Sequence, residues 1–138
     1  MISLSTPLKE LNRMNRGTLM EQLGIEYMEV KEGFVKARMP VDSRTKQPFD
    51  ILHGGASLAF AETIASLGSA VITDLETNNI RGASVTANHI GAVSGGEVTG
   101  EARLLHRGKI THVWDVSILD QQGAGVSLAR VTIIVVPK

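Results

Sequence analysis

Residues 52–62, LHGGASLAFAE, place His53, Gly54 and Gly55 directly ahead of an apolar segment that contains a single carboxylate, Glu62. From residue 55 to residue 72 nearly every side chain is apolar or small, which is typical of a helix enclosed by other structure. An ionised carboxylate is costly to bury without partners. Glu62 is therefore either a shielded functional group or a solvated helix glutamate, and its apolar neighbours favour the functional interpretation.

The helix face that carries Glu62 is narrow and partly hydroxylic. Its other members at helical spacing are Gly55, Ala59, Ser66 and Ser69. Such a stripe lets a ligand or another backbone approach closely while polar groups meet it. Ser66 could instead hydrogen-bond its own helix, and Thr63 follows Glu62 in sequence but turns toward another face.

Short strands surround this central helix. Two strand-like segments precede it and four follow it, at residues 25–30, 34–39, 81–90, 97–106, 110–119 and 126–136. Consecutive strands with turn residues between them predict an antiparallel sheet, and the one long helix must cover one of its faces. We expect a single α+β domain over residues 1–138, in which one six-stranded sheet curls around one helix.

The connections carry their own signals. Thr6 followed by Pro7 predicts the start of a short helix, and Thr18 with Glu21 is a capping-box pattern for a second, which Gly24 ends. We expect these two helices to serve as lids or packing pieces. The glycine-rich residues 94–96 lack the lysine and the helix of a phosphate loop and predict a hairpin.

The overall composition excludes several classes of protein. Lys plus Arg and Asp plus Glu both total 14, so no charge excess indicates a nucleic-acid or anionic-membrane partner. The absence of cysteine excludes disulfides and thiolate chemistry. Charges interrupt residues 1–16, unlike a signal peptide, and no apolar run reaches membrane-spanning length. We expect a cytoplasmic protein without a metal, because its histidines lack zinc-motif spacing.

A specific motif combination lies around the helix start. Gln47-Pro48-Phe49, then His53-Gly54-Gly55, then Glu62 resemble the hotdog-fold acyl-CoA thioesterases of the 4-hydroxybenzoyl-CoA, 1,4-dihydroxy-2-naphthoyl-CoA and enterobactin-proofreading type. Residues 39–42, 88–89 and 105–114 also match, so the resemblance covers the chain from about Gly24 to its end.

The resemblance implies a division of roles. Glu62 would attack the thioester or activate a water, while the Gly54 N–H would polarise the carbonyl at the positive helix start. Gln47 would hold the water or the thioester, and His53 would orient the carbonyl region. No cofactor is implied beyond the coenzyme A of the substrate.

The resemblance also implies a homodimer with shared sites, which we expect to pair into a dimer of dimers. Helix geometry independently favours sharing, because Glu62 lies roughly 13 Å along the helix from His53, at 1.5 Å per residue. One carbonyl cannot readily touch both ends of that span. A two-fold interface would create two sites.

Other positions carry weaker signals. His89 is a candidate pocket or interface residue near the acyl group, and Arg107 and Lys109 are candidates for holding the coenzyme A phosphates. Gly91-Ala92 replaces the Arg-Pro of many relatives. His53 could merely cap local backbone, and the two glycines could merely permit a sharp turn.

Two other functions remain open from the sequence. One is a hotdog hydratase or dehydratase, which would remove water from a 3-hydroxyacyl-CoA without releasing thiol. The other is a non-catalytic acyl-CoA-binding protein, for which an intact Glu62 would be unnecessary. We expect the substrate to be an aryl- or medium-chain acyl-CoA, and the particular acyl group does not follow from the sequence.

Overall fold

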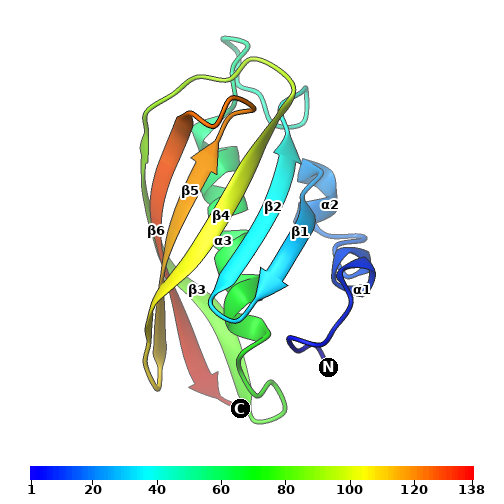
Figure 1. Cartoon of the computed structure of the whole chain (residues 1–138), viewed down its shortest axis with the longest axis vertical. Helices are drawn as coiled ribbons and strands as arrows, with labels where there is room; N and C mark the ends of the chain where they lie inside the picture. The colour runs from blue at the N-terminus through cyan, green and yellow to red at the C-terminus, as the bar shows by residue number, and fades with distance from the viewer.

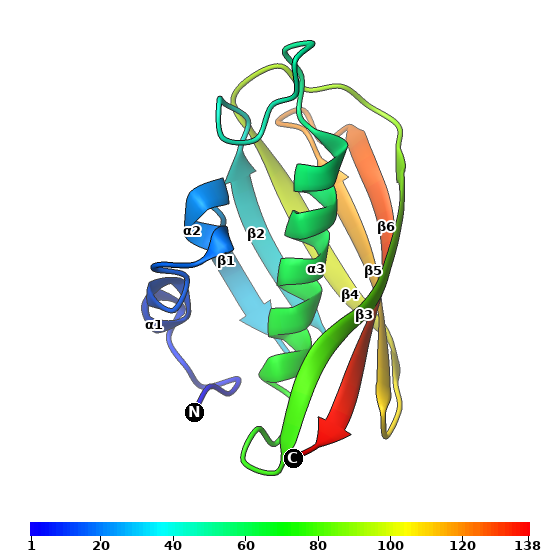
Figure 2. The ribbon, with the colours of Figure 1, turned by 180° about the vertical axis from the view of Figure 1, so that it is seen from behind.

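The computed structural model describes residues 1–138. An antiparallel sheet curves around one long helix, and two short helices lie at the β1 edge of the sheet (Figures 1 and 2). In chain order, the elements are α1 (Leu8–Arg13), α2 (Leu19–Leu23), β1 (Glu26–Lys31), β2 (Phe34–Pro40), α3 (Gly54–Ala70), β3 (Asn78–His89), β4 (Glu97–Arg107), β5 (Thr111–Leu119) and β6 (Gly125–Pro137). The α+β class and the six-stranded sheet around a central helix are confirmed. None of the helices combines the length and apolar character needed to cross a bilayer.

The strand order is β1-β2-β4-β5-β6-β3, and every neighbouring pair is antiparallel. β3 pairs with β6 at one edge, so the chain from β3 to β4 crosses the end of the sheet (Figure 1). The predicted hairpin at residues 94–96 is therefore wrong. Turn residues report only local chain reversal. β4 buries Val98 and Ala102 and lies inside the sheet, with a paired strand on each side. β3 is largely exposed, which is typical of a strand at the edge of a sheet.

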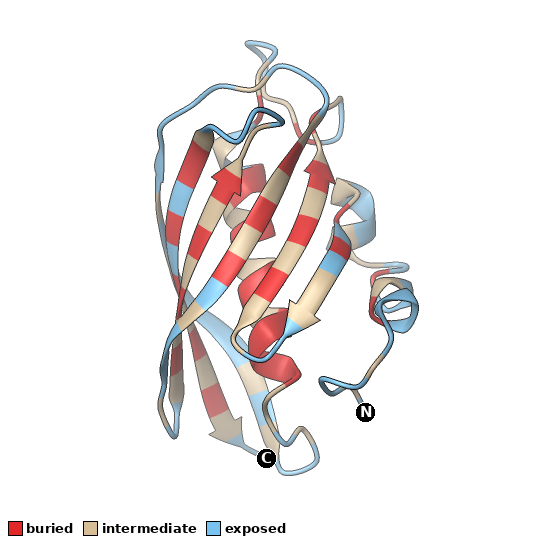
Figure 3. Ribbon diagram, viewed as in Figure 1, coloured by how far each residue is buried: buried red, intermediate tan, exposed pale blue.

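The core lies between the concave face of the sheet and α3. Val35, Ala37 and Met39 alternate along β2 and are fully buried. Figure 3 shows the same banding across the neighbouring strands. On β4, a β-carbon at Gly100 would lie 2.9 Å from the Phe60 ring, so glycine lets the helix approach the sheet closely.

Helix α3 is covered mainly on its sheet side. Phe60, Ala61 and Ile64 are fully buried, while the strip formed by Ala59, Glu62, Thr63 and Ser66 is only half-buried. The sequence-based expectation of a helix enclosed on all sides is thus too strong, because the single chain leaves this strip partly open.

Ser69 does not belong to the Glu62 stripe. Its hydroxyl is fully buried on the core side, where it accepts a hydrogen bond from Trp114 Nε1 at 2.9 Å and bonds with His112 Nδ1 at 2.9 Å. Ser69 follows Glu62 by seven residues, so helical spacing predicted that both lie on one face of the helix. Instead, the hydroxyl of Ser69 faces its buried polar partners on β5.

Thr18 is the N-cap of α2, but the hydrogen bonds at the starts of the two short helices differ from the predicted patterns. α1 begins after Pro7, and the Thr6 hydroxyl accepts from the Ser3 N–H. Glu21 accepts a hydrogen bond from the Gly17 N–H at 2.7 Å, whereas a capping box needs the N–H of Thr18. Gly24 does end α2 with a left-handed φ of 72°, as predicted.

Candidate active site

The start of α3 presents a free backbone donor. His53 is the N-cap residue, and its Nδ1 accepts from the Gly55 N–H at 2.7 Å. This bond matches the local capping role considered for His53, and it directs Nε2 away from the helix. The Gly54 N–H has no acceptor within the chain. Unpaired N–H groups at a helix start favour negative charge, so Gly54 can stabilise an oxyanion.

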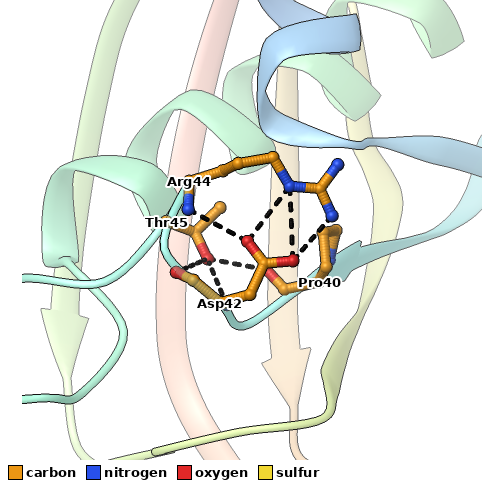
Figure 4. Close-up of polar contacts among 4 residues, drawn as sticks. All are labelled: Pro40, Asp42, Arg44 and Thr45. Atoms are coloured by element: carbon orange, nitrogen blue, oxygen red, sulfur yellow. Dashed lines mark hydrogen bonds and ion pairs between the residues drawn. The ribbon is translucent and has the colours of Figure 1, made fainter.

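The loop ahead of α3 is anchored at Thr45, which is 2% exposed. Its hydroxyl donates to the Pro40 carbonyl at 2.7 Å and accepts from the Asp42 N–H at 3.2 Å (Figure 4). Its carbonyl accepts from the His53 N–H at 2.8 Å. One buried threonine thereby ties the end of β2 to the start of the helix.

An ion pair closes the same turn. Arg44 contacts Asp42 at 2.6 Å, and its hydrogen bonds lower the pKa of Asp42 to about 2 (Figure 4). Gln47 follows this turn, and its Oε1 accepts from the Phe49 N–H. The side chain of Gln47 is therefore held within its own loop, close in sequence to the helix start that begins at His53.

His89 lies against the helix start. A β-carbon at Gly54 would lie 2.7 Å from His89 Nε2, so only glycine accommodates the ring there. His89 Nδ1 bonds with Ser127 Oγ at 3.0 Å, which links the end of β3 to β6. The structure thus places His89 beside the Gly54 donor rather than beside the cavity that contains Glu62.

Glu62 lines a cavity of about 390 Å³ between α3, the N-terminal helices and the edge strand β3. Most of its lining residues are apolar, and they include Leu11, Met14, Leu19, Met20 and Ile80. None of the chain's ion pairs involves Glu62. Nothing in the chain neutralises this carboxylate, so it is available to meet a substrate in the cavity.

Glu62 is held against the backbone of β3. Its Cδ lies 2.8 Å and its Cγ 3.2 Å from the place that a β-carbon of residue 82 would occupy, so Gly82 is required for this contact. Thr63 donates its hydroxyl to the Ala59 carbonyl at 2.7 Å, whereas Ser66 lines the cavity without a hydrogen-bond partner in the chain. Ser66 is therefore the more available of the two hydroxyls.

The single chain does not bring all the candidate residues together. Glu62 follows Gly54 by eight residues on one helix, a rise of about 12 Å. Arg107 donates to the Ile72 carbonyl at 2.7 Å, past the opposite end of α3, and Lys109 is exposed in the following turn. Within one chain, His53, Gly54 and His89 meet at the helix start, and Gln47 lies in the loop that precedes it. Glu62, Thr63 and Ser66 line the separate cavity.

Sequence reasoning missed two contributors to the Glu62 cavity. Gly82 is one of them. An isolated glycine inside a strand pattern could have indicated that another group approaches the strand backbone closely at that point. The other is the N-terminal segment, whose apolar side chains were expected only to pack or to act as a lid. They form much of the cavity wall.

A sheet wrapped around one helix, with a free N–H at the helix start and an unpaired carboxylate over an apolar cavity, defines a hotdog-fold enzyme of the hydrolase class. Residues 49–127 match the family model described as Thioesterase superfamily. The chain belongs to this superfamily and is a thioesterase-type hydrolase, which confirms the resemblance inferred from the motifs.

Individual relatives agree with this assignment. The chain is 42% identical over 125 residues to the proofreading thioesterase EntH of Cronobacter turicensis, covering 91% of this chain and 90% of the relative. It is 38% identical over 125 residues to the 1,4-dihydroxy-2-naphthoyl-CoA hydrolase of Escherichia coli K12, covering 91% of each. A crystal structure of a glutamine-to-alanine variant of thioesterase PA1618 from Pseudomonas aeruginosa superposes with a TM-score of 0.94 at 38% identity, covering 97% of this chain and 96% of that one.

Proposed function

We propose that the chain hydrolyses acyl-CoA thioesters, with an aryl or medium-chain acyl group, and that Glu62 is the catalytic carboxylate. The observation that carries the proposal is the unpaired Glu62 at the wall of an apolar cavity in a thioesterase-type chain. The 1,4-dihydroxy-2-naphthoyl-CoA hydrolase among its relatives supports coenzyme A as the thiol half of the substrate.

The proposed reaction uses protein groups and water. As a general base, Glu62 takes a proton from water while the water oxygen attacks the thioester carbon. The carbonyl oxygen becomes an oxyanion, which the Gly54 N–H stabilises by about 3 to 4 kcal/mol, the cost of removing a comparable donor. The C–S bond then breaks, the coenzyme A thiolate takes a proton from Glu62, and a carboxylic acid remains.

Nucleophilic attack by Glu62 is the other route to the same products. A carboxylate oxygen would attack the thioester carbon, the C–S bond would break with release of the coenzyme A thiolate, and a mixed anhydride would form. Water would then hydrolyse that anhydride, giving the carboxylic acid and a proton for the thiolate. Single turnover in oxygen-18 water identifies attack by Glu62 when the released acid is unlabelled. Attack by Glu62, followed by water adding to the enzyme carbonyl, leaves an unlabelled acid in the first turnover, whereas general-base catalysis labels the acid.

We propose that the working enzyme is a homodimer in which Glu62 of one subunit meets the partner subunit's Gly54, Gln47 and His53. Two features support this sharing. Within one chain Glu62 and Gly54 are about 12 Å apart along the helix. β3 is a long edge strand with little cover, and such an edge is a template for pairing with another chain.

The direct test is thiol release from a panel of acyl-CoAs by the wild-type protein and by Glu62→Gln. We expect the variant to lose at least about 100-fold in turnover, the usual range for loss of a catalytic base. Glu76→Gln, which changes an exposed glutamate outside the cavity, is the matched control and should retain full turnover. Equal turnover in wild type and Glu62→Gln would remove Glu62 from the catalytic role.

A further inference from the structure

We infer that Leu19 sets the upper size limit of the acyl group, by separating the Glu62 cavity from a second cavity beside the helix start. This inference rests on the proposed acyl-CoA hydrolysis. It names a specificity-determining residue in the N-terminal segment, at the first position of the short helix α2.

Two cavities lie along the same helix. The Glu62 cavity of about 390 Å³ borders α3 from Ala59 to Ala70. The second, of about 290 Å³, borders the N-cap residue His53 and the first turns of α3 as far as Ala59, and also contacts Leu23 and Thr45.

Leu19 and Ala59 are the two residues that line both cavities. Ala59 belongs to the helix floor and carries only a methyl group. Leu19 comes from α2 and is the larger of the two side chains, so it is the group that can narrow the passage between the cavities. An acyl group bound beside Glu62 is therefore confined to the first cavity while Leu19 is present.

The second cavity can accept an apolar chain. Its two nearby cations are already paired, Arg44 with Asp42 at 2.6 Å and Lys46 with Asp50 at 2.8 Å. Apolar atoms form most of its wall. A longer acyl group that passed Leu19 would thus meet hydrocarbon rather than unpaired charge, which favours its burial.

Leu19 is also free to be changed. It is 60% exposed and lies outside the buried core of the chain. Removing its side chain should therefore widen the passage without unfolding the protein, since large losses of stability come from buried positions.

The experiment compares kcat/KM across straight-chain acyl-CoAs of increasing length for wild type and Leu19→Ala. In the wild type, kcat/KM should fall once the acyl group outgrows the first cavity. In Leu19→Ala, it should keep rising over several further methylenes, by about fourfold for each one buried. Leu19→Trp should move the limit toward shorter acyl groups.

Met14→Ala is the matched control. Met14 is also exposed, at 52%, and lines the Glu62 cavity without touching the second one. It should change rates for acyl groups that fit the first cavity without extending the length limit. An unchanged length limit in Leu19→Ala, or the same extension in Met14→Ala, overturns the inference.

Binding of acyl-CoAs to the Glu62→Gln protein distinguishes a wrong role for Leu19 from a wrong proposed function. Titration calorimetry with the same acyl-CoAs should show that Leu19→Ala extends the length that binds, independently of turnover. If wild type hydrolyses the panel but the limit does not move, only the role of Leu19 falls. If no acyl-CoA is bound or hydrolysed, the proposed function falls, and the inference falls with it.

Discussion

Replacing Gly82 with alanine should remove activity while leaving the fold intact. The new β-carbon would occupy the place of Glu62 Oε1 and would lie 2.8 Å from Cδ, closer than real β-carbons approach. The carboxylate is the far end of a flexible side chain, so it should move aside. A displacement of about 1 Å at a catalytic group can cost about 100-fold in rate, or about 2.7 kcal/mol of barrier.

Stability should change in the opposite direction. Gly82 is exposed on an edge strand, and its φ lies outside the left-handed region. Glycine inside a strand costs roughly 0.5 to 1 kcal/mol relative to alanine through lost conformational entropy. Gly82→Ala should therefore unfold at the same or a slightly higher urea concentration than wild type.

The assay is thiol release from an acyl-CoA that the wild type hydrolyses, together with urea unfolding of the same samples. Gly95→Ala is the control, because a β-carbon there would meet nothing within 4 Å. Full activity in Gly82→Ala would refute the reasoning, since it would show that the position of Glu62 against β3 is irrelevant to catalysis. Loss of activity together with a large loss of stability would also refute it.

Two predictions concern the packing of α3 against β5. Gly68→Ala would bring a β-carbon to 2.7 Å from Trp114 Cζ2, and overpacking should lower the free energy of unfolding by about 1 to 3 kcal/mol, measured by urea denaturation. Burial lowers the pKa of His112 below its ordinary 6.5, with smaller contributions from Arg107 and His106. The unfolded chain then binds the proton more tightly, so the stability that His112 contributes is complete above about pH 6.5 and is lost as pH falls through the folded pKa. Urea unfolding between pH 8 and pH 5 should show this decline, and His112→Asn should flatten it much more than His106→Asn does, because burial is the larger cause of the shift.

The sequence predicted the individual helices and strands more accurately than it predicted which strands lie side by side. The alternation of Val35, Ala37 and Met39 encodes a half-buried strand directly, because side chains alternate between the two faces of a sheet. The glycines at residues 94–96 indicated a chain reversal but did not encode which strand it joins. Strand order depends on long-range pairing, so β3 lies beside β6 and not beside β4.

For the candidate site too, the sequence predicted the local features but not the contacts between distant segments. The motif from Gln47 to Glu62 was sufficient to predict the family and the helix start, since capping by His53 and a free Gly54 N–H follow from local geometry. The sequence could not show that Gly82, 20 residues further along, holds the Glu62 side chain. That contact requires the edge strand to pass over the helix.

The sequence by itself therefore determined the class of this protein and the identity of its unusual carboxylate, because both are written in local pattern and spacing. Only the tertiary structure decided what surrounds Glu62. The N-terminal segment supplies part of the cavity wall, β3 supplies the backbone against which the carboxylate rests, and Leu19 and Ala59 line both this cavity and its neighbour. These are contacts between segments far apart in the chain, and they depend on how the sheet closes around α3.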